Sequence, residues 1–273
     1  MGGVRADEED LPRQECAVTV LGGPTAVIDL GGLRIVVDPT FDDPGPHGYL
    51  TKTTGPAVPE SRLGPVDAVL VSHDAHPDNL DDRGRAFAMA APLTLTVPSA
   101  AARLGPRAAG LAPWATRTLP RRDGGGDLTV QAVPAVHGPE DGERDPQGHI
   151  NCEVTGFVLS GMGLPTVYVS GDNASMRAVA EIARRVPDID AAVLNAGAAR
   201  VQGKFRERPV SMDARRVAAA AAVLGVAVVI PAHYDGWTHF SEGRAELETA
   251  FDEAGLSALL RLTGHGSWSA LRG

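Results

Sequence analysis

Short apolar runs separated by pairs of glycines are the feature that most limits how this chain can fold. Three such runs lie close to the N-terminus, over residues 17–21, 25–30 and 33–37, with Gly22-Gly23 and Gly31-Gly32 between them. This pattern is typical of consecutive short strands joined by tight turns. Beyond a loop rich in proline and glycine, apolar runs alternate with helix-like segments. The chain is therefore expected to be an α/β protein in which two sheets pack between helices.

Composition narrows the class of protein further. The 273 residues carry a formal net charge of −9, and 43% of them are apolar, enough for a large core. The negative charge argues against a nucleic-acid or anionic-membrane partner, because a phosphate surface attracts a basic face. No apolar run approaches the roughly 20 residues needed to cross a bilayer, and the polar N-terminus lacks the apolar centre of a signal peptide. We expect a cytoplasmic protein that acts on a small molecule.

The domain organisation is expected to be simple. Residues 1–15 are polar and acidic and are predicted to form a disordered leader, whereas residues 16–273 contain no linker of distinct composition and are predicted to form a single domain. Cys16 and Cys152 lie in apolar, strand-like runs and are expected to be small buried side chains, since two cysteines cannot make a disulfide framework.

Side chains that bind metals follow four of the apolar runs. These side chains are His73, His137, Asp172 and His233. In α/β folds the loops at strand ends converge, so we expect the four to share one site. The first of them opens a dense cluster, HDAHPDNLD, and imidazole nitrogens and carboxylate oxygens are the ligands that Zn²⁺ takes. The sequence therefore predicts a metal centre.

That cluster resembles the H-x-H-x-D-H motif of the metallo-β-lactamase superfamily. It is most similar to the branch of L-ascorbate-6-phosphate lactonase and N-acyl-phosphatidylethanolamine phospholipase D, which reads roughly S-H-D-H-x-D-H-L-D where this chain reads S-H-D-A-H-P-D-N-L-D. Four more stretches follow the pattern of the branch in order, namely LGGPTAVIDLGGLRIVVDPTF, AVHGPE, VYVSGDNAS and PAHYDGW. The resemblance implies a four-layer α/β/β/α sandwich.

The resemblance also implies a role for each matching residue. His73, His76 and His137 would hold a first metal, Asp172 would bridge, and Asp78 and His233 would hold a second metal. One or two Zn²⁺ ions are the expected cofactor, and Mn²⁺ is an alternative at the second position, where Asn79 replaces an imidazole of the motif. The implied activity is hydrolysis of a small ester, lactone or phosphoester by metal-activated water, with Asp78 as a catalytic group that orients the water or passes a proton.

The chain departs from the motif at two positions. Inserted Ala75 shifts the register between the two histidines beside it, so Asp74 is an alternative ligand to His73. Asn79 is expected to be a weak ligand or a hydrogen-bond partner of the ligands. Asp38 is expected either to accept a hydrogen bond from a metal-bound imidazole or to be an ordinary turn residue.

Two rival functions follow from these departures. One is a degenerate relative that binds a small molecule or protein with little catalysis. The other is an enzyme of a biosynthetic pathway that uses its metal as a Lewis acid in a non-hydrolytic step.

The polar residues outside the motif are expected mainly to have structural roles. The histidines outside the motif are expected to be loop or structural residues, and they are His47, His149, His239 and His265. Tyr234, Trp237 and His239 either line a substrate pocket or pack beneath the site. Arg200, Lys204, Arg206 and Arg208 form a basic loop that either binds a substrate anion or is simply solvated, and the charged loop 138–147 could be a lid.

Overall fold

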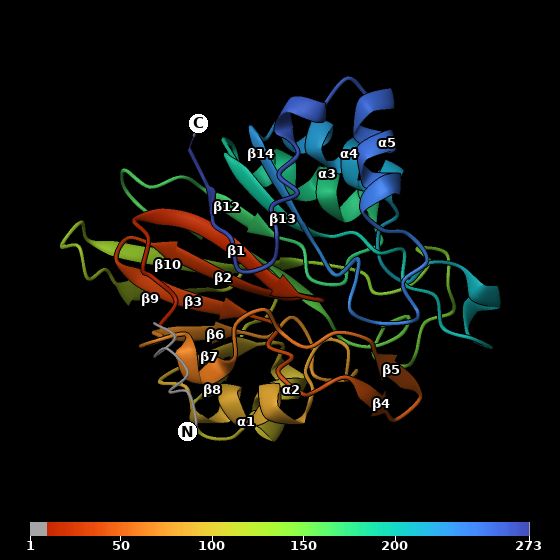
Figure 1. Ribbon diagram of the computed structural model, residues 1–273, viewed down its shortest axis with the longest axis horizontal. Coiled ribbons are helices and arrows are strands. Elements are labelled where there is room, and N and C mark those ends of the chain that lie inside the picture. The colour runs from red at the N-terminus through yellow and green to blue at the C-terminus, as the bar shows by residue number, and fades with distance from the viewer. Residues whose placement is uncertain (1–9, 273) are drawn as a thin grey trace, which may run out of the picture.

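Two β-sheets lie face to face at the centre of the molecule, and helices cover the outer face of each (Figure 1). The computed structural model describes residues 10–272. The prediction of a four-layer α/β/β/α sandwich is confirmed. Among the described residues, no helix combines the length and the apolar character that crossing a bilayer requires.

The first sheet has the strand order β15-β1-β2-β3-β6-β7-β8. Its strands are β1 (Cys16–Gly22), β2 (Thr25–Leu30), β3 (Leu33–Val37), β6 (Ala68–Leu70), β7 (Thr94–Thr96), β8 (Ala108–Gly110) and β15 (Ser269–Ala270). The glycine pairs make the tight antiparallel turns of β1, β2 and β3. Strands β6, β7 and β8 continue the sheet in parallel, whereas β15 pairs antiparallel with β1. Helices α1 (Asp82–Ala90) and α2 (Pro98–Leu104) cover the outer face.

The second sheet has the strand order β14-β13-β12-β11-β10-β9. Its strands are β9 (Thr116–Pro120), β10 (Asp127–Pro134), β11 (Thr155–Ser160), β12 (Val167–Val169), β13 (Ala191–Asn195) and β14 (Val228–Ala232). Helices α3 (Met176–Arg185), α4 (Ala214–Leu224) and α5 (Arg244–Glu253) lie on its outer face (Figure 1). The small remaining elements are a hairpin of β4 (Gly45–His47) and β5 (Leu50–Lys52) and three 3₁₀ turns, Glu60–Arg62, Phe205–Glu207 and Ser257–Leu259.

Three apolar layers hold the sandwich together. The central layer fills the space between the sheets with fully buried side chains such as Ile28 and Phe157. The second sheet packs against α3, α4 and α5 through residues such as Phe251, and the first sheet packs against α1 and α2 through residues such as Phe41. Because each sheet is apolar on both faces, both sheets need a covering layer, which explains the four-layer arrangement.

Residues 10–15 correct part of the prediction of a disordered leader. Leu11 is buried, and its backbone N–H donates to the Arg62 carbonyl at 2.7 Å. The buried Arg34 guanidinium donates to the Leu11 carbonyl at 2.9 Å and pairs with Asp29 at 2.6 Å. A buried guanidinium needs acceptors for its five N–H groups, and this segment supplies some of them, which the composition of the segment did not reveal. Residues 1–9 of the predicted leader lie outside the described residues.

Candidate metal centre

Three imidazoles meet where the loops after β6 and β10 approach each other. His73 Nε2 lies 2.9 Å from His76 Nδ1, and His137 Nε2 lies 3.1 Å from the same atom. His73 is fully buried and His137 is 4% exposed. We call His73, His76 and His137 the first cluster. The extra residue Ala75 therefore does not separate the two histidines of the motif, because a turn rather than an extended strand joins them.

The protonation of the first cluster suits metal binding. His137 Nδ1 lies 2.8 Å from the Val210 carbonyl, which can only accept, so Nδ1 carries the proton and the lone pair of Nε2 faces His76. Burial, together with the neighbouring His137 ring, lowers the pKa of His73 well below its usual value and that of His76 to about 4. His73 and His76 are therefore neutral near pH 7, the form in which histidine binds metals.

Two carboxylates and an imidazole form a second cluster beside the first. His233 Nε2 lies 3.1 Å from Asp78 Oδ2, and His233 Nδ1 lies 3.3 Å from Asp172 Oδ1. All three side chains are buried. We call Asp78, Asp172 and His233 the second cluster. Asp172 Oδ2 also lies 3.6 Å from His137 Nε2, so this carboxylate stands between the two clusters.

Two contacts fix Asp172 in that place. Asn195, the last residue of β13, donates from Nδ2 to Asp172 Oδ1 at 2.8 Å. Gly171 adopts a φ of +53°, and a Cβ at this position would lie 2.6 Å from the Ser72 Cβ. Glycine therefore lets the loop after β12 approach the loop after β6 closely enough to join the two sheets at the site.

The second cluster favours positive charge. Burial alone would raise the pKa of both Asp78 and Asp172. Hydrogen bonds from His233 and His239 instead hold the pKa of Asp78 well below its usual range. The charge of His233 lowers the pKa of Asp172. Burial alone would lower the pKa of His233, and the charges of Asp172 and Asp78 raise it instead. Two buried carboxylates thus stay ionised and attract a cation.

The donor set fits a bound metal. Ligands on a tetrahedral Zn²⁺, with bonds of 2.0–2.1 Å, stand about 3.3 Å apart, and the contacts above span 2.9–3.6 Å. The Asp172 Oδ2 atom is buried without a hydrogen-bond partner. Because a buried carboxylate oxygen needs compensation, a cation between these side chains supplies what the described residues do not.

Asp74 and Asn79, the two uncertain residues of the motif, do not bind the first cluster through their side chains as ligands. Asp74 pairs with Arg103 at 2.6 Å and with Arg85 at 3.3 Å, so it binds α2 and α1 and does not replace His73. Asn79 Nδ2 donates to the His73 carbonyl at 2.7 Å, and Asn79 Oδ1 accepts from Ser72 at 3.4 Å. Both polar atoms of Asn79 therefore hold the loop together.

Asp38 contacts the chain next to the first cluster. Its Oδ1 accepts from the Ser72 backbone N–H at 2.6 Å rather than from an imidazole. Burial raises the pKa of Asp38 to about 7, although hydrogen bonds from Ser72 oppose this shift. Asp38 thus fixes Ser72, which lies two residues past the end of β6 and one residue before His73, where the metal motif begins.

Two side chains near the clusters were not among the predicted ligands. Cys152, expected inside a strand, lies in the loop before β11, and its Sγ is within 4.8 Å of the ligand nitrogens of the first cluster. The strand-like stretch NCEVTGFVLS was expected to form one strand, but only its part Thr155–Ser160 forms β11. His239, expected to be a structural or pocket-lining residue, lies with Nε2 3.0 Å from Asp78 Oδ2. The only signal in the sequence was its place six residues after His233 between aromatic side chains.

The other polar features have mostly structural partners. His47, His149 and His265 lie beside the carboxylates of Asp42, Asp145 and Asp235. Trp237 is buried beneath the rings of His47 and His239, which favours packing over a place in a pocket wall. In the basic loop, Arg208 pairs with Asp141 at 2.7 Å and so ties this loop to segment 138–147.

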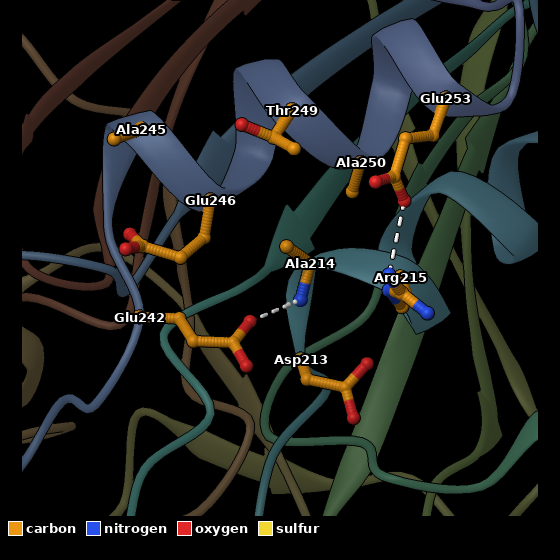
Figure 2. A pocket seen from close by; sticks show the side chains of 9 residues that line it. All are labelled: Asp213, Ala214, Arg215, Glu242, Ala245, Glu246, Thr249, Ala250 and Glu253. Atoms are coloured by element: carbon orange, nitrogen blue, oxygen red, sulfur yellow. Dashed lines mark hydrogen bonds and ion pairs between the residues drawn. The ribbon is translucent and has the colours of Figure 1, made fainter.

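Two hollows in the protein surface are candidate substrate sites, one between helices α4 and α5 and one beside the first cluster. Figure 2 shows one of about 330 Å³ between α4 and α5, where the Glu242 carboxylate accepts from the Ala214 backbone at 2.7 Å. Asp213 and Glu246 in the same hollow cap the helices α4 and α5, and Glu253 pairs with Arg215, so the acidic groups of the hollow already have structural partners. The other hollow, of about 250 Å³, is lined by His137 and Cys152 and therefore adjoins the first cluster.

Comparison with known proteins decides the family. Residues 33–234 match the model of the Beta-lactamase superfamily domain. The chain belongs to the beta-lactamase superfamily. It is 27% identical over 250 residues to a UPF0173 metal-dependent hydrolase from Methanosphaerula palustris, an alignment that covers 90% of this chain and 96% of the relative.

Solved structures of the superfamily share the fold. An isothiocyanate hydrolase from Delia radicum gut bacteria superposes with a TM-score of 0.77 at 22% identity, covering 94% of this chain and 100% of that one. A possible metal-dependent hydrolase from Veillonella parvula superposes with a TM-score of 0.79 at 18% identity and the same coverage. The resemblance to the superfamily is confirmed, whereas the narrower branch with the lactonase and the phospholipase stays a prediction.

Proposed function

We propose that this metal-dependent hydrolase of the beta-lactamase superfamily cleaves a small ester, lactone or phosphoester, with one or two Zn²⁺ ions as its cofactor. The observation that carries the proposal is the convergence of the two clusters on Asp172. Donors that are distant in sequence, His76 and His137 from one pair of loops and Asp78 and His233 from another, meet at distances that match ligands around shared ions.

Each cluster would hold one ion. The three imidazoles of the first cluster are a typical Zn²⁺ ligand set, and the carboxylates of the second cluster suit either Zn²⁺ or the harder Mn²⁺. Asp172, which lies between the two clusters, would help to hold both ions. When bound, such an ion lowers the pKa of a coordinated water to about 7 and polarises the bond to be cleaved.

The protein residues orient the reactants. Asp78 stays ionised, so its carboxylate accepts a hydrogen bond from a water and directs the lone pair of that water toward the substrate. The hollow beside His137 offers room for a small substrate next to the first cluster. Arg144 of segment 138–147 lines this hollow and would contact an anionic substrate group there, and the Arg208–Asp141 ion pair ties the basic loop to the same segment.

The degenerate alternative is not favoured. A chain that had lost its metal would keep two ionised buried carboxylates and a buried Asp172 oxygen without a hydrogen-bond partner. Such groups destabilise a fold unless a cation or hydrogen bond compensates them. The donor atoms in both clusters remain suitable for a metal.

The test combines metal content with activity. Purified protein is assayed against a panel of generic esters, lactones and phosphodiesters, with an isothiocyanate added because a hydrolase of this fold is named for that substrate. Treatment with a chelator and the variant His137→Ala should each abolish metal binding at the first cluster and all activity. The matched control is His265→Ala, an imidazole outside the clusters, which should retain both. Activity that survives in His137→Ala would contradict the proposal.

A further inference from the structure

His239 occupies the position of an additional ligand in the second cluster. Its Nε2 atom lies 3.0 Å from Asp78 Oδ2, and its side chain is 7% exposed. We propose that His239 binds the second metal ion and supplies the imidazole that Asn79 does not provide. This inference rests on the proposed function, because it assumes that the second cluster holds an ion.

His239 and His233 lie at nearly the same distance from the Asp78 carboxylate. The Nε2 atoms of the two residues lie 3.0 and 3.1 Å from the same oxygen, Asp78 Oδ2. Their rings stand 6.4 Å apart at 77°, so the two nitrogens approach from different directions. Separations of 3.0 and 3.1 Å from one carboxylate oxygen match those between neighbouring ligands on a tetrahedral Zn²⁺, which stand about 3.3 Å apart.

Rigid contacts hold the His239 ring in this place. Phe240 lies against both imidazoles, with ring centroids 4.3 Å from His233 and 4.5 Å from His239. On either side of the ring the backbone is bonded, since the His239 carbonyl accepts from Arg200 at 2.9 Å and the Thr238 N–H donates to Thr51 at 3.1 Å. A ligand held before the metal arrives loses little conformational freedom when it binds.

Asn79 explains why a ligand from elsewhere is needed. At this position of the motif the resembling enzymes carry histidine, but Asn79 is fully buried and uses both polar atoms on Ser72 and His73. The second cluster would then hold its ion with two carboxylates and one imidazole. His239, which lies 161 residues from Asp78 in the sequence, restores the second imidazole.

The experiment compares four proteins: wild type, His239→Ala, His239→Gln and His47→Ala. Glutamine retains an N–H that can donate to Asp78 but offers zinc only a weak amide oxygen. His47→Ala removes another imidazole that contacts Trp237, without touching either cluster. Bound metal is measured by elemental analysis at saturating Zn²⁺, affinity by chelator competition, and coordination by the absorption of Co²⁺-loaded protein. Circular dichroism checks the fold of each variant.

We expect wild type and His47→Ala to bind two ions. Both His239 variants should bind the second ion more than about 100-fold more weakly. The loss of a direct ligand should exceed the roughly 10–100-fold effect of losing a hydrogen-bond partner of a ligand. A His239→Gln variant that binds the second ion like wild type would overturn the inference and make His239 a hydrogen-bond donor only. A wild type that binds a single ion would overturn it as well while leaving the proposed function intact. A wild type that binds no ion would contradict the proposed function itself.

Discussion

The first and second clusters lie side by side, with Asp172 in contact with both, yet the pKa values of their histidines shift in opposite directions. In the first cluster, burial lowers the pKa of His73 and His76, and the rings stay neutral. In the second cluster, the carboxylates raise the pKa of His233 against its burial, and the cluster favours a positive charge. The difference shows how one fold can offer two kinds of metal site within a few ångströms.

The cause lies in the elements that supply the donors. The first cluster takes only imidazoles, two of them from the turn after β6. The second takes Asp78 from the same turn and Asp172 from the end of β12, so two negative charges meet in a buried place. We therefore expect the first cluster to prefer zinc and the second to accept harder ions more readily.

The largest expected effect follows from removing the shared carboxylate charge. Asp172→Asn preserves the shape of the side chain and removes the negative charge that lies beside both clusters. Both sites should weaken together, and hydrolysis should fall by about 10³-fold, because the ions contribute several kcal/mol of charge stabilisation in the transition state. Steady-state kinetics and metal content measure this, and loss of only one ion would show that Asp172 does not bridge.

The next effect concerns pH in the metal-free protein. The pKa of His76 is about 4 in the folded state, below the usual value of 6.5. As pH falls, His76 is therefore protonated in the unfolded chain before it is protonated in the folded protein. The folded state loses stability as pH falls from 6.5 to 4. The pKa of His233 is raised, so its contribution is complete below 6.5 and is lost as pH rises through its folded pKa.

Urea unfolding of chelator-treated variants measures these opposite signs. Relative to wild type, His76→Gln should gain up to about 3 kcal/mol in the free energy of unfolding between pH 6.5 and pH 4. His233→Gln should lose stability relative to wild type as pH falls to 6.5 from the raised folded pKa of His233, and the difference should then stay constant down to pH 4. Parallel pH profiles for the two variants would contradict the electrostatic contrast between the clusters.

A smaller effect separates Asn79 from the ligands. Asn79→His restores the residue of the motif, but the larger ring must fit a fully buried position and loses the hydrogen bond to the His73 carbonyl. We expect a loss of about 2 kcal/mol in the free energy of unfolding and no gain in affinity for the second ion. Tighter binding of the second ion by Asn79→His would show that position 79 faces the second cluster after all.

The smallest effect concerns Asp74, which lies inside the motif but outside both clusters. Asp74→Asn weakens the ion pairs with Arg85 and Arg103, and these arginines are 32% and 54% exposed. The free energy of unfolding should fall by about 1 kcal/mol, and metal content should not change. Asp43→Asn, at a side chain that is 93% exposed, is the control without effect on either. Lost metal in Asp74→Asn would restore Asp74 as a ligand.

The sequence allowed the first three strands of the first sheet to be predicted almost residue by residue. The glycine pairs mark both turns, and the runs 25–30 and 33–37 coincide with β2 and β3. The predicted site residues also lie together, because each follows a strand whose end is easy to recognise. Hydrophobic runs and turn residues are local signals, and the local signals here agree with the final fold.

Contacts between distant loops could not be predicted in the same way. Nothing near His239 in the sequence indicates that a carboxylate 161 residues away accepts its hydrogen bond. The loop position of Cys152 and the ordered contacts of Leu11 likewise depend on partners far along the chain, the first cluster and Arg34. Such contacts arise from how the two sheets stack, which no single segment encodes.

Anomalous diffraction at the zinc edge tests the central claim most directly. Crystals of the full chain grown with Zn²⁺ should show two peaks, one among His73, His76 and His137 and the other beside Asp78 and His233, with Asp172 between them. Peaks outside both clusters, or no zinc peak within reach of Asp172, would contradict the account.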